Sequence, residues 1–189
     1  MRRLFLLLCL FAALPAFAAE DLAERVIARL ASYPVVRADF VQERTQPSLT
    51  KPVVSTGRMV LSREHGLLWQ VETPVKVTLV FTASGATGGG ASEAEMGRLV
   101  RAILTGDLRE LRSEFTFEAH GDLERWTIRL LPKAREVAQY LRVIELGGGA
   151  HLESIGIEET AGERLRVRMK SFIVASELEP AERKALALP

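Results

Sequence analysis

The chain has 189 residues, of which 25 are basic and 24 acidic, so its formal charge is close to zero. This length fits one domain with a core of useful size. The even charge balance argues against a nucleic-acid-binding protein, which typically carries a basic face or stripe.

The first eighteen residues have the pattern of a secretory signal peptide. Arg2 and Arg3 form a positive start, residues 4–14 are an apolar stretch, and Ala16-Phe17-Ala18 has the small-x-small form that signal peptidase accepts. The apolar stretch is shorter than the roughly 18 residues of a membrane-spanning helix, although a retained N-terminal anchor is the alternative. We therefore expect cleavage after about Ala18, export to the periplasm, and a single domain over residues 19–189.

The single cysteine, Cys9, lies inside that apolar stretch. The mature protein then has no cysteine, which excludes disulfides and thiol catalysis. Cys9 is an unsuitable lipidation site because it comes too early in the chain and follows the bulky Leu8. We expect a soluble protein that is not anchored by a lipid.

A helix is predicted over residues 21–32. Asp21 is a good N-cap with Glu24 as its capping-box partner, and Tyr33-Pro34 ends the helix. One narrow apolar stripe repeats at every fourth position and consists of Leu22, Val26 and Leu30.

The period of the pattern then changes to two, which is typical of half-buried strands. Pro74 is a turn residue between the last two of these strands, and the short connections favour an antiparallel meander. The predicted strands are Val36–Phe40, Val53–Arg63, Leu67–Glu72 and Val75–Thr82.

Residues 84–92 are rich in Gly, Ala, Ser and Thr and are predicted as a flexible loop without a strand. A second helix follows, with Ser92 and Glu95 as a capping box and Gly106 as its C-cap. Its broad apolar face consists of Met96, Leu99, Val100, Ile103 and Leu104. A further short helix is predicted over residues 107–111.

Strands resume in the remainder of the chain, with residues 132–138 predicted as a loop and a short helix predicted after Pro180. The predicted strands are Phe115–Ala119, Leu123–Leu131, Leu141–Leu146, Leu152–Glu158 and Arg164–Val174. About nine antiparallel strands with one apolar face predict a mainly β (α+β) fold: an incomplete barrel, or strongly curved sheet, with helices covering its concave apolar side. Such a barrel can leave a ligand cavity.

Five short motifs between residues 38 and 74 narrow this interpretation. In chain order they are Ala38-Asp39-Phe40-Val41-Gln42, Ser55-Thr56-Gly57-Arg58-Met59, Ser62-Arg63, Leu67-Leu68-Trp69 and Thr73-Pro74. Their order and spacing, after a signal peptide and a helix, resemble the N-terminal half of the LolA family of periplasmic lipoprotein carriers. The resemblance covers roughly residues 21–82.

The resemblance implies a carrier that works as a monomer. Such a carrier has no cofactor, no metal and no catalytic residues. An ATP-driven inner-membrane complex loads it with lipoprotein acyl chains, and an outer-membrane acceptor receives them. Arg63 matches the family's arginine that bonds to a helical lid and holds the empty form closed. The residues expected to line the cavity and the lid are Phe40, Met59, Leu61, Trp69, Val71, Leu79, Phe81, Met96, Leu99, Val100 and Ile103.

Simpler roles remain open for these residues. The strand residues could be ordinary core, the helix stripe an ordinary amphipathic face, and Arg63 a surface turn residue. Phe115 and Phe117 could line the far wall or fill a hairpin core.

The sequence also departs from the family beyond residue 82, because Ser84-Gly85 is followed by the predicted loop and helix in place of a further strand. This divergence leaves open a glycolipid or a polyene-type lipid as cargo. The chain could also be a lipid-binding or lipoprotein-sensing module without a transport role. An enzyme is a weak alternative, because no Gly-x-Ser-x-Gly elbow occurs. The three histidines are far apart, so we expect no metal site.

Overall fold

The structure, a computed structural model, describes residues 16–82, 85–88, 101–102 and 108–186. Its main element is one ten-stranded sheet in the order β5-β4-β3-β2-β1-β10-β9-β8-β7-β6. The strands are β1 (Val35–Thr45), β2 (Val53–Ser62), β3 (Gly66–Thr73), β4 (Val77–Thr82), β5 (Gly85–Thr87), β6 (Phe115–Gly121), β7 (Trp126–Pro132), β8 (Leu141–Gly148), β9 (Leu152–Glu159) and β10 (Arg164–Ala175).

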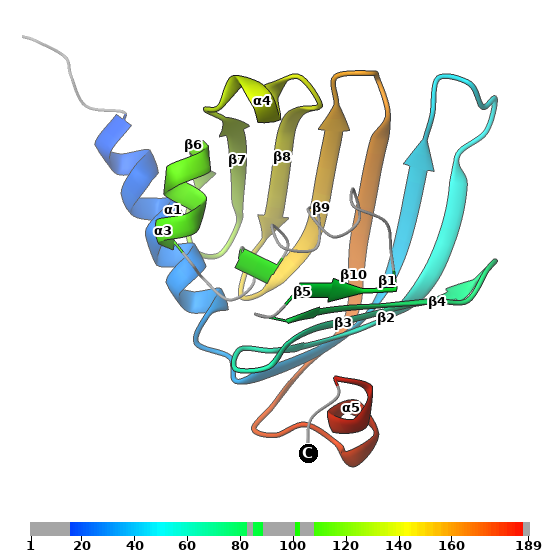
Figure 1. Ribbon diagram of the computed structural model, residues 1–189. Coiled ribbons are helices and arrows are strands. Elements are labelled where there is room, and N and C mark those ends of the chain that lie inside the picture. The colour runs from blue at the N-terminus through cyan, green and yellow to red at the C-terminus, as the bar shows by residue number, and fades with distance from the viewer. Residues whose placement is uncertain (1–15, 83–84, 89–100, 103–107, 187–189) are drawn as a thin grey trace, which may run out of the picture.

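All neighbouring strands in the sheet run antiparallel. β1–β5 form one meander, which we call the N-terminal half-sheet, and β6–β10 form a second, the C-terminal half-sheet. β1 pairs with β10 and joins the two. The sheet curves strongly but does not close, because β5 and β6 are its two ends (Figure 1). The predicted mainly β fold with an open curved sheet is therefore confirmed.

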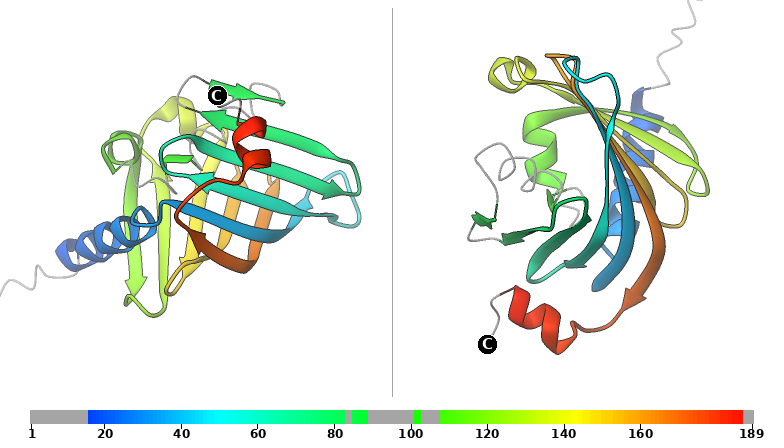
Figure 2. Two further views of the ribbon diagram at one scale, coloured as in Figure 1. Left: turned by 90° about the horizontal axis from the view of Figure 1, so that it is seen from below. Right: turned by 90° about the vertical axis from the view of Figure 1, so that its right-hand side faces the viewer.

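The helices are α1 (Ala16–Leu30), α3 (Leu108–Glu114), α4 (Arg135–Ala138) and α5 (Pro180–Ala185). α1 contacts β6, and α3 lies on the concave side of the sheet, whereas α5 lies beyond the convex side of β2 and β3 (Figure 2). None of the described helices is long and apolar enough to cross a membrane.

The main core fills the concave side. α1 contributes Ala23, Val26, Ile27 and Leu30, each at most 5% exposed. Alternate residues of the strands complete the cluster, because successive side chains of a strand point to opposite faces. A smaller cluster on the convex side contains Val35, Val60, Leu68 and Leu186, and the last of these attaches the C-terminal segment to the sheet.

Several predicted element boundaries were wrong. α1 begins at Ala16, so Asp21 lies inside the helix and forms an ion pair with Arg25 at 3.7 Å in place of a cap. The expected cleavage site after Ala18 falls in the first turn of α1. β1 continues to Thr45, well past the predicted end at Phe40, because backbone pairing with β2 and β10 does not require apolar side chains.

Two predicted loops contain regular structure. Residues 85–87, predicted as loop, form β5 by pairing with β4, and they add a tenth strand. Residues 135–138, also predicted as loop, form the single turn α4. Both elements are too short to show a period in the sequence.

Candidate functional site

The cavity-lining residues predicted on strands share the concave face of the N-terminal half-sheet. Met59 lies opposite Trp69, and Trp69 lies opposite Leu79 on the next strand. Opposite residues of antiparallel strands point to the same face, so these side chains meet. All seven belong to the concave cluster or pack against it: Phe40, Met59, Leu61, Trp69, Val71, Leu79 and Phe81.

An aromatic pair lies at the centre of this face. The rings of Phe40 and Trp69 stack with centroids 4.1 Å apart and an interplanar angle of 22°. Gly57 lies opposite Phe40 on β2, and its lack of a side chain makes room for the Phe40 ring. A Cβ on Gly57 would lie 2.7 Å from Phe40 Cζ and 2.0 Å from the carbonyl oxygen of Gln70.

The concave positions of β1 change from apolar to polar along the strand. Val36, Ala38 and Phe40 are buried, and the next two concave positions are Gln42 and Arg44. Ser55 lies opposite Gln42 on β2 and is also largely buried. The concave face therefore has an apolar end near α1 and a polar end near the β1–β2 connection.

The polar end carries a small group of charges. Arg44 Nη1 donates to Glu163 Oε1 at 2.6 Å, and Gln46 Nε2 donates to the same oxygen at 3.1 Å. Burial and the neighbouring Glu163 raise the pKa of Glu159, whereas Arg44 lowers it less strongly. This end is therefore polar and charged, in contrast to the apolar end of the same face.

The apolar end contains a pocket of about 20 Å³. It is lined by Leu30, Tyr33, Val36, Ala38, Met59, Leu61, Leu152, Met169 and Phe172. Met59 and Leu61 belong to the predicted set, and Tyr33, Leu152, Met169 and Phe172 do not. The pocket is thus continuous with the predicted cavity face.

Phe172 could not be assigned to this pocket from alternation along its strand. Leu165, Val167 and Met169 point to the concave face, and simple alternation would place Ser171 there next. The register between β1 and β10 shifts between Arg37 and Asp39, and Ser171 has a positive φ of 52°. This bulge turns Phe172 to the concave side.

The predicted lid residues Met96, Leu99, Val100 and Ile103 lie outside the described residues. Two residues of the same predicted helix, Arg101 and Ala102, are described and are helical. Ala102 is fully buried and belongs to the concave cluster. At least this part of the predicted helix therefore packs against the concave face.

Arg63 follows β2 directly, and its side chain is exposed. Its backbone N–H donates to the carbonyl oxygen of Pro34 at 3.0 Å. With Ser32, His65 and Glu177 it lines an open groove beside the C-terminal segment. The described residues thus place Arg63 at the β2–β3 turn, near the apolar end of the face.

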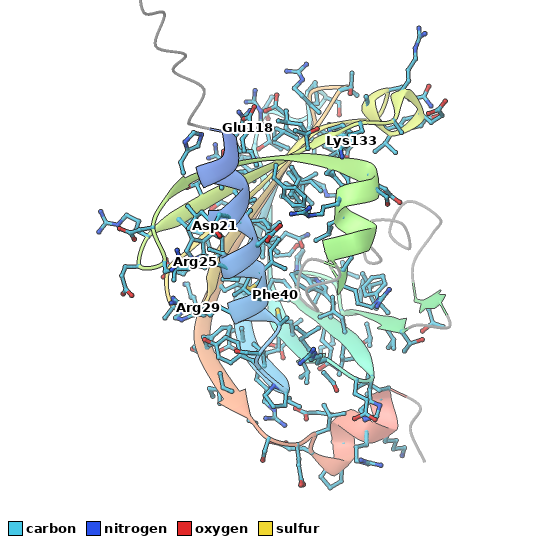
Figure 3. The ribbon with its side chains drawn as sticks, turned by 90° about the vertical axis from the view of Figure 1, so that its left-hand side faces the viewer. Asp21, Arg25, Arg29, Phe40, Glu118 and Lys133 are labelled. Carbon is cyan, nitrogen blue, oxygen red and sulfur yellow. The ribbon has the colours of Figure 1, made fainter. Side chains whose placement is uncertain are left out.

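Charged groups elsewhere lie mainly on the outside. Figure 3 shows that Asp21, Arg25 and Arg29 follow one side of α1. Arg29 Nη1 donates to the carbonyl oxygen of Leu123 at 2.9 Å. Among the described residues, no group of three or more His, Cys, Asp and Glu side chains could hold a metal ion.

Comparison with known proteins identifies the fold but not a sequence family. No family model and no curated protein matches the sequence. A LolA superfamily protein, NE2245 from Nitrosomonas europaea, aligns with 85% of this chain and 96% of its own at 8% identity and a TM-score of 0.47. A putative outer membrane lipoprotein-sorting protein domain from Vibrio parahaemolyticus aligns over 91% and 99% at 9% identity, with a TM-score of 0.46.

The structure of the MucA/MucB complex of Pseudomonas aeruginosa gives a TM-score of 0.50 at 13% identity. It aligns with 85% of this chain, which spans only 59% of the matched chain. The predicted resemblance is confirmed at the level of the fold alone, which is an open, strongly curved antiparallel sheet.

Proposed function

We propose that the protein binds the acyl chains of a lipoprotein, or of a related lipid, on its concave face and carries them from the inner to the outer membrane. One observation carries this proposal: the apolar concave face continues across β1–β4 in a sheet whose two end strands do not meet. The protein then acts by binding and not by catalysis.

Acyl chains provide a large driving force for such binding. Each buried CH₂ group contributes roughly 0.8 kcal/mol, so a whole chain is costly to expose to water. A carrier therefore needs an extended apolar surface that is covered when no cargo is bound. The stacked Phe40 and Trp69 offer such a surface at the centre of the face.

The proposed route follows from the resemblance. The chain is exported with cleavage after about Ala18, and the mature monomer works in the periplasm. An ATP-driven inner-membrane complex loads it, and an outer-membrane acceptor receives the cargo. The motifs between residues 38 and 74 and the open curved sheet support this assignment, and the cargo is either a lipoprotein or a free lipid.

We assign the lid role to the predicted helix with Met96, Leu99, Val100 and Ile103, and the latch role to Arg63. The burial of Ala102 in the concave cluster supports the lid, because this residue lies in the same predicted helix. One hydrogen bond is worth about 1 kcal/mol net, so Arg63→Ala should raise the affinity for a fatty acid about fivefold by opening the empty form. Arg63→Lys keeps the charge and serves as control; equal affinities of all three proteins would contradict the latch.

The two tryptophans of the chain provide a direct test of the binding face. Trp69 lies on the proposed cargo face, whereas Trp126 lies in the C-terminal half-sheet, 2% exposed, with its Nε1 donating to the Gly149 carbonyl oxygen at 2.8 Å. We would measure fluorescence quenching by a brominated fatty acid in mature Trp69→Phe and Trp126→Phe. Strong quenching only where Trp69 remains supports the proposal, and no saturable quenching in either variant contradicts it.

A second candidate function is the binding of a partner protein, as in a sensing module. The likeness to the MucA/MucB complex structure, at a TM-score of 0.50, favours this alternative. Native mass spectrometry of the protein isolated from its own cell envelope distinguishes the two. Bound lipid supports the carrier, and a stoichiometric protein partner without lipid supports the sensing module.

A further inference from the structure

The pocket at the apolar end has the size and chemistry of a site for a methyl group. All nine side chains that line it are apolar or aromatic, and its volume is about 20 Å³. A water molecule needs two to four polar partners to be stable in a cavity, and this pocket offers almost none. Hydrocarbon is therefore the ligand chemistry that fits.

Two aromatic rings of the lining, Phe172 and Tyr33, form an aromatic wall of this pocket, and His151 supports it from outside the lining. Phe172 of β10 contacts Tyr33 edge-on at 5.8 Å between centroids and stacks on His151 at 4.3 Å and 19°. Tyr33 Oη donates to the carbonyl oxygen of Ala150 at 2.9 Å, which fixes its ring. The wall is therefore held from both sides and has a defined position.

Two methionines make other parts of the lining more adaptable. Met59 and Met169 both line the pocket, and the unbranched thioether side chain of methionine readily adjusts to a new neighbour. Met59 also lies opposite Trp69, so the pocket opens toward the proposed cargo face through an adjustable residue.

The polar groups lie at the other end of the same face. From the pocket outward, the concave positions of β1 run from Val36 to Phe40 and then to Gln42 and Arg44. Arg44 is paired with Glu163 there. An amphipathic ligand along β1 then has one favourable direction.

From these features we infer that the acyl chain binds with its methyl end in the pocket and its head toward Arg44, and that Phe172 limits the length of chain that fits. This inference rests on the proposed function and adds a ligand orientation and a specificity-determining residue to it. A chain longer than the distance from the polar end to Phe172 must leave methylene groups in water.

The test is a chain-length series measured on the mature protein. Straight-chain saturated fatty acids from decanoate to eicosanoate displace a fluorescent fatty acid, and the best-bound length is determined. Phe172→Ala removes the wall, so the optimum should shift to longer chains, with about fourfold tighter binding for each methylene that becomes buried. Phe172→Trp fills the pocket and should shift the optimum to shorter chains.

Phe117→Ala is the matched control, because Phe117 is also a half-buried aromatic residue packed against the concave cluster, but on β6. It should leave the optimum unchanged. Phe172→Trp keeps the test valid if Phe172→Ala does not fold, as judged by circular dichroism.

The outcomes separate this inference from the proposed function. If the wild type binds fatty acids and every Phe172 variant that folds keeps the same optimum, the inference is wrong and the carrier proposal stands. If the wild type binds no fatty acid of any length, the carrier proposal itself fails. Opposite shifts in the two Phe172 variants support both.

Discussion

Two regions of the sheet bury their concave residues to different extents: β7 and β8 in the C-terminal half-sheet, and β3 and β4 in the N-terminal half-sheet. In the C-terminal half-sheet, Ile128, Leu130 and Leu146 are completely buried, and α1 packs against β6. In the N-terminal half-sheet, Val71 and Leu79 are only partly buried, although they occupy equivalent inward positions. The same strand pattern thus forms a filled core at β7 and β8 and a less completely covered apolar face around Val71 and Leu79.

This difference suggests that one part of the sheet mainly stabilises the fold and another part binds the ligand. The filled region at β7 and β8 supplies stability, because fully buried side chains contribute the most transfer free energy and packing. The partly covered region at β3 and β4 keeps apolar surface that a ligand can cover. The two tryptophans illustrate it: the Trp126 Nε1–H is bonded to a backbone carbonyl in the core, whereas Trp69 stacks on Phe40 at the proposed cargo face.

Equal truncations in the two halves provide the sharpest test of this comparison. Leu130→Ala should lower the free energy of unfolding by about 4 kcal/mol, because it leaves a cavity in a completely buried site. Leu79→Ala should cost only about 1 kcal/mol, because Leu79 is partly exposed. Urea denaturation followed by circular dichroism measures both, and similar losses for the two variants would show that the halves do not differ.

The sequence predicted the more regular parts of both halves. β2 and β3 were placed within one or two residues, because their apolar residues alternate clearly. The seven strand residues of the predicted site do share one face. Alternation needs only the strand period, and that period is visible in any sequence that is apolar on one side.

The parts that were missed depend on contacts distant in the sequence. The polar part of β1 forms a strand because its backbone pairs with neighbouring strands. Residues 85–87 form β5 because their backbone pairs with β4. Phe172 reaches the pocket through a bulge whose position depends on the register with β1. None of these features leaves a local pattern of side chains.

A second prediction concerns the close contact beneath the aromatic pair. Gly57→Ala should lower stability by about 2 kcal/mol, because the new Cβ would clash with the Gln70 carbonyl and with Phe40. The Trp69 fluorescence should change as well, since the stack must move. Gly156→Ala in the C-terminal half-sheet is the control, because its Cβ would meet nothing closer than 3.7 Å.

Gly156→Ala should be neutral or slightly stabilising, by about 0.5 kcal/mol, through a less flexible unfolded chain. If both alanine variants are equally stable, the close approach of Phe40 and the Gln70 carbonyl to Gly57 does not restrict this position to glycine.

The smallest predicted effect concerns the outer face of the N-terminal half-sheet, where α5 is attached. Arg37 donates to both carboxylate oxygens of Glu182 at 2.6 Å. Burial raises the pKa of Glu182, but the hydrogen bonds from Arg37 and from the Glu179 backbone outweigh this, so the net pKa is lowered. Glu182→Gln should therefore cost about 1 kcal/mol at neutral pH.

The lowered pKa of Glu182 also predicts how its contribution to stability changes with pH. Because the pKa of Glu182 is lower in the folded state, its contribution is complete above the unfolded pKa, about 4.3, and is lost as the pH falls through the folded value. The stability difference between wild type and Glu182→Gln should thus be largest near pH 7 and disappear in acid. Glu177→Gln is the control, because Arg37 donates to the backbone carbonyl of Glu177, which this substitution keeps. A difference that persists unchanged in acid would mean that the attachment of α5 does not depend on the Glu182 carboxylate.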